Sequence, residues 1–340
     1  NTYIVHIGEY QKTSGNNLRV GISNSDSTGN DLAVSSTINS STDLSNASFS
    51  FTVSGTGVHY LYMYMQDSNG GNSVAHFDNI SVRLGDSDRS VNNNGLQVHG
   101  TITKDPVATG ADLVGYGGFT SSNYLEQPYN SDLDFGTGDF SFTAWFKANS
   151  AGGAQYLYKR GANTGGSAGM TIWTAADLQY IALYINGAAI HTPAGIYPLG
   201  VWNQLIIARR NGVVTFYING VSKHSGNNTA SVPTGMATQV GYSATSSSLS
   251  LSRISATAPT AEQIAKIYED EKVLFQENAK ATLYGTSDAV TALAHDDDTN
   301  LLHVGTSSGR SVFQGLRRVD NTTDAVGTCI SASNDLVVEE

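Results

Sequence analysis

The sequence predicts an all-β protein whose central sandwich ends in a single helix, and three observations support this prediction. Only 14% of the 340 residues are charged, whereas Gly (36) and Tyr (17) are frequent, which suits short strands and turns. Apolar and polar residues alternate over short runs, as they do in half-buried strands. The tetrapeptide Tyr-Ile-Asn-Gly occurs twice, and its Asn186-Gly187 and Asn219-Gly220 pairs are typical of two-residue hairpin turns.

Residues 1–85 are predicted to form a first β domain. The run YLYMYM places Tyr60 and Tyr62 on one face of a strand and Leu61 and Met63 on the other. Both faces are apolar, so we expect a central strand that is buried on both sides. The later run FDNISVRL is similar to the last strand of the jelly-roll modules, akin to carbohydrate-binding modules, of bacterial and phage surface proteins. That resemblance implies a jelly-roll module or its second half.

Residues 86–278 are predicted to form a β-sandwich. In DFSFTAWFK, the apolar Phe140 and Phe142 alternate with polar residues, as in a strand that has one face in a core. The segment APTAEQIAKIYEDE then changes to helical periodicity, and Thr260 and Gln263 have the spacing of a capping box. We therefore expect strands up to this segment and a helix at its end.

The order of motifs in this segment resembles the concanavalin A-like, laminin G-like family. The matching runs are GTGDFSFTAWFK, WNQLIIARRNGVVTFYINGV and LSRISATAPTAEQIAKIYEDE. The resemblance implies a sandwich that closes with a strand and a short helix, and it makes Trp202 a structural position. The family includes lectins, adhesion modules, glycan hydrolases and structural domains, so the resemblance does not by itself define a function.

Residues 279–340 are predicted to return to strands and to form a small β-rich region. The run AVTALAHDDDTNLLHVGTSSGRSVFQGL reads as strand, turn, strand, turn, strand, and it resembles one blade of a β-propeller. A single blade cannot bury both of its faces, so it must pack on the sandwich, on copies of itself or on further residues. We therefore expect this region to serve in packing or oligomerisation.

Charge and cysteine content exclude several classes of partner and structure. A net charge of −11 without a basic patch argues against nucleic acid and against anionic membrane surfaces. The uncharged stretch 178–208 is broken by Asn-Gly, Pro and Gly, so no membrane insertion is expected. The one cysteine, Cys329, permits no intrachain disulfide.

The sequence also lacks catalytic motifs. No strand-like run holds alternating acids such as E-x-D-x-x-E, which glycan hydrolases of this fold place along one cleft. Glu269, Asp270 and Glu271 are consecutive on the helix, so their side chains point in different directions and are expected to be solvated. The run GTSSG at 305–309 precedes a strand-like run rather than the helix of a nucleophile elbow, which favours a hairpin turn. We expect no enzymatic activity.

Candidate ligand-binding residues are aromatic side chains near turns of the middle segment. Sugar binding combines an aromatic ring with amides and carboxylates that match hydroxyl groups. Trp173, Tyr180 and Tyr197 are the candidates for such a ring, and each could instead belong to the core or to its rim.

Candidate metal ligands are Asp132 and Asp134, which alternate in NSDLDFG. They form either the turn before a strand or part of a calcium site, which would need six to eight oxygen ligands. The aspartates of HDDDTN at 295–300 favour a hairpin turn, since Asp and Asn are preferred there. We expect no cofactor, and calcium is the one that these residues leave open.

Taken together, the three segments resemble tail-fibre and other virion surface proteins of tailed phages. The resemblance implies a homo-oligomer, a trimer first of all, that lies on the virion surface beside other virion proteins and contacts host-surface glycans. We therefore expect a non-enzymatic structural and adhesion protein. Two alternatives stay open: a purely structural capsid or tail decoration protein, and a glycan depolymerase.

Overall fold

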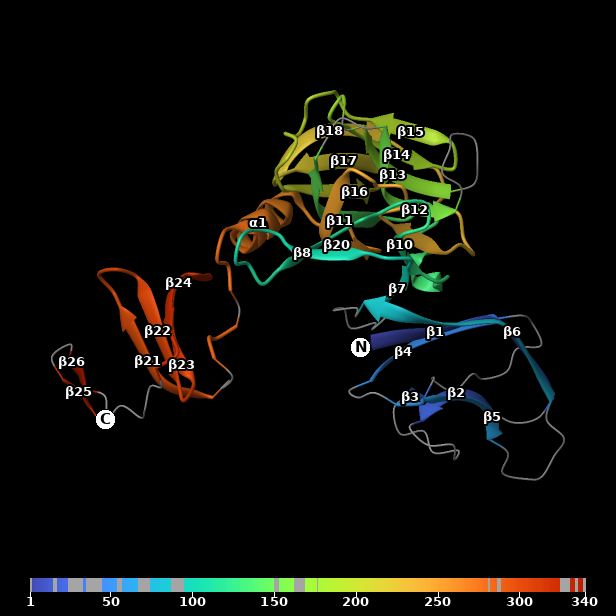
Figure 1. The fold of residues 1–340 in the computed structure, drawn as a ribbon. Coiled ribbons are helices and arrows are strands. Elements are labelled where there is room, and N and C mark those ends of the chain that lie inside the picture. Colours follow the sequence, from blue (N-terminus) through green and yellow to red (C-terminus); the bar gives the residue numbers. More distant parts are fainter. Residues whose placement is uncertain are drawn as a thin grey trace.

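The computed structural model shows an almost entirely β chain in three parts (Figure 1). A sandwich with one helix occupies the top of the view, an N-terminal β module lies below it, and a separate four-stranded sheet lies at the lower left. The structure describes residues 2–14, 17–23, 33–34, 45–53, 57–66, 74–86, 95–149, 153–161, 169–175, 177–280, 282–285, 289–324, 331–333 and 336–338.

Two antiparallel sheets form the sandwich. The first contains β7 (Leu96–His99), β10 (Tyr124–Gln127), β12 (Ala154–Gly161), β13 (Gly169–Ala175), β14 (Tyr180–Ile185), β15 (Ala188–His191) and β19 (Thr238–Val240) in the order β15-β14-β13-β12-β19-β10-β7. The second contains β8 (Thr103–Pro106), β9 (Val114–Gly117), β11 (Phe140–Ala148), β16 (Asn203–Arg210), β17 (Val213–Ile218), β18 (Val221–Asn227) and β20 (Ser247–Ser255) in the order β18-β17-β16-β11-β20-β9-β8.

The main core lies between these two sheets. Phe140, Phe142 and Phe146 of β11 are at most 1% exposed and pack against the inward side chains of the opposite sheet. The polar face of β11 is covered too: Trp145 is 3% exposed because the helix and the residues after it lie on this side. The predicted all-β sandwich is confirmed.

The two Tyr-Ile-Asn-Gly motifs are hairpin turns, as predicted. Asn186-Gly187 joins β14 to β15 with φ values of 47° and 84°, and Asn219-Gly220 joins β17 to β18 with φ values of 51° and 76°. Left-handed φ values at both turn residues define the turn that matches the twist of a hairpin, and Asn and Gly tolerate them best.

The predicted helix is α1 (Ala261–Lys272), followed by the 3-10 turn η2 (Val273–Phe275). The Thr260 side chain accepts a hydrogen bond from the Gln263 backbone N–H, and the Gln263 side chain accepts one from the Thr260 N–H. This confirms the capping box, which satisfies two amides at the helix N-terminus. Ile264 is fully buried against the sandwich.

Glu271 of α1 differs from its expected solvated role. Trp145 Nε1 donates a hydrogen bond of 2.7 Å to Glu271 Oε2, and Gln204 Nε2 donates to the same oxygen at 3.1 Å. Arg253 forms an ion pair with the other carboxylate oxygen. The expectation was wrong for this residue. Consecutive helical residues point in different directions, so Glu269 and Asp270 face solvent whereas Glu271 faces the outer side of the second sheet, which contains β11 and β16.

The N-terminal module contains β1 (Thr2–Ser14), β2 (Asn17–Ser23), β3 (Ala33–Val34), β4 (Ser45–Thr52), β5 (Tyr60–Gln66) and β6 (Val74–Asp86). The strands β4, β1 and β6 lie against a small sheet of order β3-β2-β5. A compact core joins them, made of Val5, Ile7, Val20, Ile22 and Phe51.

The strand β5 is not the central strand that its sequence suggested. Among the described strands it pairs with β2 and ends the three-stranded sheet. Tyr60 and Met63, which point to opposite faces, are 38% and 42% exposed. The alternation of a strand shows which side chains share a face but not how many neighbours the strand has, and this is why the prediction failed.

The first sheet of the sandwich continues into the N-terminal module. Gly85 and Asp86 at the end of β6 pair with Gln97 and Leu96 of β7, so one hydrogen-bonded sheet of ten strands runs from β15 to β4. The Gln97 side chain also donates to the Ser81 hydroxyl at 3.4 Å. The predicted division at 85/86 stays a prediction, and backbone pairing crosses it.

The C-terminal strands β21 (Val290–Asp296), β22 (Leu301–Thr306), β23 (Gly309–Gln314) and β24 (Arg317–Thr322) form an antiparallel meander, and β25 (Ser331–Ser333) pairs with β26 (Leu336–Val338). The turns at 297–300 and 307–308 confirm that HDDDTN and GTSSG are hairpin loops. Lys280 N donates to Leu316 O at 2.8 Å, and Lys280 Nζ lies 2.8 Å from Asp112 Oδ1, so the segment after α1 links this meander to the sandwich.

The Glu271 contacts predict a large difference between two neighbouring acids. Glu271→Ala leaves two buried donors without an acceptor, and we expect it to lower the free energy of unfolding by about 3 kcal/mol. Asp270→Ala removes an exposed pair with Lys266 and should cost less than about 0.5 kcal/mol. Urea denaturation followed by tryptophan fluorescence measures both, and equal losses would contradict the anchoring role.

Candidate ligand-binding face

The outward face of the ten-stranded sheet carries a group of polar aromatic side chains. In a strand, successive side chains point to opposite faces. In β13, Ile172 is fully buried in the core, whereas the next residue, Trp173, points outward and is partly exposed. In β14, Leu183 enters the core, and Tyr180 and Tyr184 point outward beside Trp173.

Four of these side chains form what we call the Trp173 cluster: Trp173, Tyr180, Tyr184 and His191. The Trp173 ring centroid lies 5.3 Å from that of Tyr180 and 6.3 Å from that of Tyr184. His191 of β15 stacks on Tyr180 at 5.7 Å, and its Nε2 shares a 2.9 Å hydrogen bond with the Tyr184 hydroxyl. The structure therefore brings together two of the three predicted aromatic residues, Trp173 and Tyr180.

A second group, the Tyr242 cluster, lies nearer the middle of the sheet and comprises His99, Tyr124, Tyr156, Lys159 and Tyr242. The Tyr242 ring meets Tyr124 at 5.7 Å and Tyr156 at 6.4 Å, both edge-on. His99 stacks on Tyr124 with a centroid distance of 4.5 Å. Lys159 Nζ lies 3.9 Å from the centre of the Tyr242 ring, a cation–π contact.

The two clusters adjoin and form one surface. Trp173 of β13 is the cross-strand partner of Tyr156 of β12. Beyond them, Gln239 pairs with Lys159 on one side and with Glu126 on the other, and its amide donates to Glu126 Oε2 at 3.2 Å. We call the two clusters together with Glu126 and Gln239 the aromatic face.

Burial shifts the pKa of several groups on this face. Burial lowers the pKa of His99, and Arg83 lowers it further, although Glu126, 3.5 Å from its Nε2, acts in the opposite direction. Burial likewise lowers the pKa of Lys159, and it raises the pKa of the Tyr124 and Tyr156 hydroxyls. Tyr124, Tyr156 and His99 are therefore neutral at neutral pH and present hydroxyl and imidazole groups for hydrogen bonding.

Tyr197 does not belong to this face. Its side chain is 2% exposed, packs edge-on against Phe146 in the core and shares a hydrogen bond with the Thr174 hydroxyl. The ring therefore cannot stack on a ligand, which corrects the candidate role. Trp202 is structural, as the family resemblance implied: its Nε1 donates to Val107 O at 2.8 Å.

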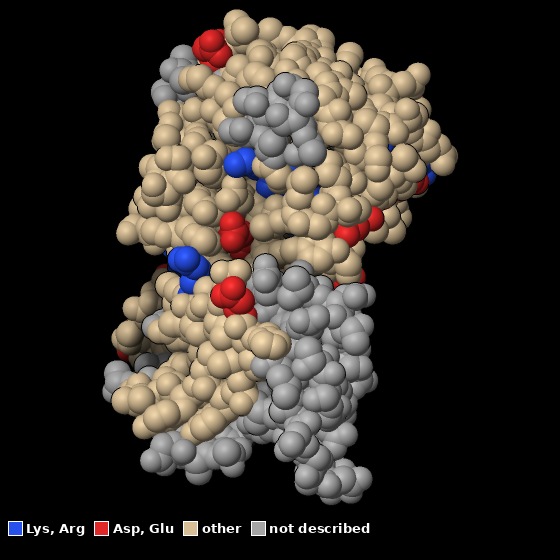
Figure 2. Space-filling model, turned by 90° about the vertical axis from the view of Figure 1, so that its right-hand side faces the viewer, with Lys and Arg blue, Asp and Glu red and all other residues tan. Residues whose placement is uncertain are grey.

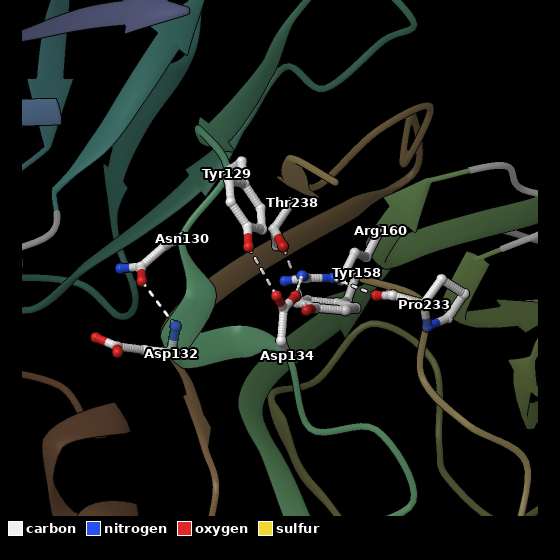
Figure 3. Close-up of polar contacts among 8 residues, drawn as sticks. All are labelled: Tyr129, Asn130, Asp132, Asp134, Tyr158, Arg160, Pro233 and Thr238. Carbon is white, nitrogen blue, oxygen red and sulfur yellow. Dashed lines mark hydrogen bonds and ion pairs between the residues drawn. The ribbon is translucent and has the colours of Figure 1, made fainter. Parts of the chain in front are cut away.

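The aspartates that were candidate calcium ligands point apart (Figure 3). Asp134 forms an ion pair with Arg160, which is fully buried, and accepts a 2.8 Å hydrogen bond from the Tyr129 hydroxyl. Asp132 lies in the 3-10 turn η1 (Ser131–Leu133), and its exposed carboxylate faces away from that pair. The sequence alternates the two residues, but the turn sends their carboxylates in different directions.

The described residues also contain no group of three or more His, Cys, Asp or Glu side chains that could hold a metal ion. Of the two interpretations of Asp132 and Asp134, the geometry supports the turn.

Within the described residues, no helix is long and apolar enough to cross a membrane.

Sequence reasoning missed most of the aromatic face. Tyr184 follows Tyr180 by an even number of residues in one strand, so the sequence could have predicted that the two side chains share a face. Tyr124 lies on β10 and Tyr242 in the turn after β19, and the two become neighbours through the pairing of β10 with β19 although they are distant in the sequence. No local pattern indicates that pairing.

Charged side chains are sparse on the surface in Figure 2, and those of both signs gather where the sandwich meets the N-terminal module. Most of the described surface in this view carries uncharged side chains. A ligand on such a surface meets hydroxyl, amide and aromatic groups rather than a strong field of one sign.

Comparison with known proteins places the central domain in a fold class. Residues 119–265 match a family model described as the concanavalin A-like lectin/glucanases superfamily. Together with the two facing sheets, this match shows that the central domain has a concanavalin A-like, laminin G-like fold. A search of curated proteins finds no match.

Solved structures with some likeness include toxin binding domains and a sialidase. The binding domain of botulinum neurotoxin DC, in complex with rat synaptotagmin II, is 13% identical over 74% of this chain and 66% of its own length, with a TM-score of 0.43. The botulinum neurotoxin serotype G binding domain is 12% identical over 75% of this chain and 68% of its own, with a TM-score of 0.44. The Trypanosoma rangeli sialidase is 12% identical over 53% and 33%, with a TM-score of 0.39. Scores this low carry no argument about function.

The Asp134–Arg160 pair predicts the effects of two alanine substitutions. Asp134→Ala leaves a buried guanidinium without its counter-charge, and we expect it to lower the free energy of unfolding by about 3 to 5 kcal/mol. The matched change Asp132→Ala removes an exposed carboxylate and should cost less than about 0.5 kcal/mol. Thermal and chemical denaturation would measure both. If calcium instead raised the melting temperature of the native chain, and both variants lost that increase equally, a calcium site would be supported.

The lowered pKa of His99 predicts an acid sensitivity. When the pKa is lower in the folded state, the unfolded chain binds more protons as the pH falls below the ordinary histidine value of about 6.5. The His99 contribution to stability is therefore present above that pH and is lost as the pH falls toward the folded-state pKa. Comparing unfolding free energies of the native chain and His99→Gln across this range should show a smaller loss in the variant. Parallel curves would contradict the assignment.

Proposed function

We propose that this chain is a non-enzymatic adhesion protein that binds glycans through the aromatic face. The observation that carries the proposal is the Trp173 cluster, where a partly exposed indole and two tyrosines lie together on a hydrogen-bonded sheet. Aromatic rings cover the apolar faces of sugar rings, and the neighbouring hydroxyl and amide groups match sugar hydroxyls. Rings mounted on strands are already ordered, so little conformational entropy is lost on binding.

The distribution of carboxylates favours binding over hydrolysis. Glycoside hydrolysis generally uses two carboxyl groups within about 5 to 9.5 Å of each other. The aromatic face contains one carboxylate among the described residues, that of Glu126 on β10, and Asp177 lies farther along the sheet at the turn after β13. These strands are three positions apart, or roughly 14 Å at ~4.8 Å per strand. A depolymerase remains the less supported candidate.

The location that we propose is the surface of a tailed-phage virion, in a fibre-like appendage that contacts host glycans beside other virion proteins. The motivation is the modular order of an N-terminal β module, a lectin-like sandwich and a small C-terminal sheet. The C-terminal meander exposes apolar side chains, Val290 (52%) and Leu293 (66%) among them, which supports self-association. Sedimentation as a monomer at micromolar concentration would contradict that part of the proposal.

Trp173 provides the direct test of glycan binding. We expect the native chain to bind members of an array of defined oligosaccharides, and Trp173→Ala to weaken the best binder about tenfold, since one lost stacking contact is worth ~1.5 kcal/mol. Tyr217→Ala is the matched control, because Tyr217 is a partly exposed aromatic on the opposite sheet. Isothermal titration calorimetry measures both variants.

Three results would decide against this function. If the array shows no binding, a purely structural capsid or tail decoration role takes its place. If Trp173→Ala binds as the native chain does while Tyr217→Ala does not, the glycan site lies on the other sheet. Release of reducing ends from a polysaccharide by the purified protein would support the depolymerase alternative.

A further inference from the structure

We infer that the aromatic face takes an extended, uncharged polysaccharide chain, which lies across the strands from β15 to β10 and has one sugar unit held at Lys159, Gln239 and Glu126. This inference rests on the proposed function and names the ligand class of the same site. It goes further because it states the length and the charge of the ligand and assigns the Tyr242 cluster a sugar unit of its own.

The length of the ligand follows from the sheet order. The outward rings begin with His191 on β15, continue through Trp173 on β13 and Tyr156 on β12, and end with Tyr124 on β10. The order β15-β14-β13-β12-β19-β10 contains five strand spacings, or about 24 Å at ~4.8 Å each. A disaccharide covers one cluster at most, whereas a chain of several sugar units reaches both.

The middle of this path offers hydrogen-bonding groups of both kinds. Lys159 Nζ rests on the Tyr242 ring and donates no hydrogen bond to any residue in the described part of the chain. Glu126, two strands away, is an acceptor whose Oε2 is held by the Gln239 amide. Donor, amide and acceptor on three neighbouring strands suit the adjacent hydroxyl groups of a sugar, each of which both donates and accepts.

Charge selects against an acidic chain. On the aromatic face the positive charge of Lys159 is offset by the negative charge of Glu126, and Arg83, which acts on His99 and Tyr124, adds one positive charge at the edge of the face. The protein as a whole carries a net charge of −11, which repels a polyanion as it approaches. An uncharged chain avoids this repulsion and uses the same rings and hydrogen-bonding groups.

Calorimetry with oligosaccharides of two lengths tests the inference. The probes are the disaccharides and hexasaccharides of the neutral gluco-, manno-, galacto- and xylo-series, with hexasaccharides prepared from alginate as the acidic comparison. We expect a neutral hexasaccharide to bind at least about tenfold more tightly than its disaccharide, because it engages both clusters. We also expect its affinity to change less than about twofold between low and high salt, because no net charge is neutralised.

Variants of the Tyr242 cluster complete the test. Tyr124→Ala should weaken the hexasaccharide about tenfold, and the isosteric Glu126→Gln should weaken it about fivefold even if the tyrosine variant folds poorly. Tyr217→Ala on the other sheet is the control and should leave the affinity unchanged. Loss of hexasaccharide binding in Trp173→Ala together with full binding in Tyr124→Ala and Glu126→Gln would overturn the second cluster.

The outcomes separate this inference from the function on which it rests. Equal affinity for disaccharide and hexasaccharide, or tighter binding of the alginate hexasaccharide, would overturn the extended neutral ligand while glycan binding itself stands. Failure of every probe to bind would overturn both.

Discussion

Two buried arginines, one from each sheet, hold the end of the sandwich together, and the positions of the binding strands depend on them. Arg209 of β16 is fully buried and donates to Gly138 O at 2.8 Å, to Ala230 O at 2.7 Å and to Gly136 O at 2.7 Å, and its guanidinium lies 4.7 Å from the Phe140 ring centre. Arg160 of β12 pairs with Asp134 and donates to Pro233 O at 3.3 Å. The two connecting segments near 130–139 and 230–233 are thus fixed from both sides, since a buried cation must keep its acceptors.

The Arg160 contacts also bear on the aromatic face, because β12 carries both Arg160 and residues of that face. Arg160 points into the protein, and its neighbour Lys159 points outward onto Tyr242. The same strand carries Tyr156, the cross-strand partner of Trp173. Pairing with β13 and β19 and the Arg160 contacts together hold β12 in place, and β12 joins the two aromatic clusters. Rings supported in this way are preorganised for a ligand, which is how a site with few charges can still bind selectively.

Local patterns predicted the elements of this chain well, and contacts between distant residues account for what they missed. The Asn-Gly turns and the Thr260 capping box were readable because each depends on residues within a few positions of one another. Tyr197 and Trp173 look alike in sequence, yet one is in the core and the other outward, because burial depends on which sheet covers a segment. Glu271 shows the same limit: its solvation depends on Trp145, more than a hundred residues earlier.

The pairing of β6 with β7 has a consequence for how the chain uses its surface. Two residue pairs and one side-chain hydrogen bond continue the sandwich sheet into the N-terminal module, so backbone pairing passes from Glu126 through the buried Gln97 to Gly85 without a break in register. A single stacked sugar is bound weakly, and a sheet face gains affinity mainly by contacting more units of the same polymer. A continuous sheet supplies that length without a deep pocket. The aromatic face of such a sheet stays open to solvent. Its low charge and the neutral His99 suit it to hydroxyl-rich ligands rather than to ionic ones.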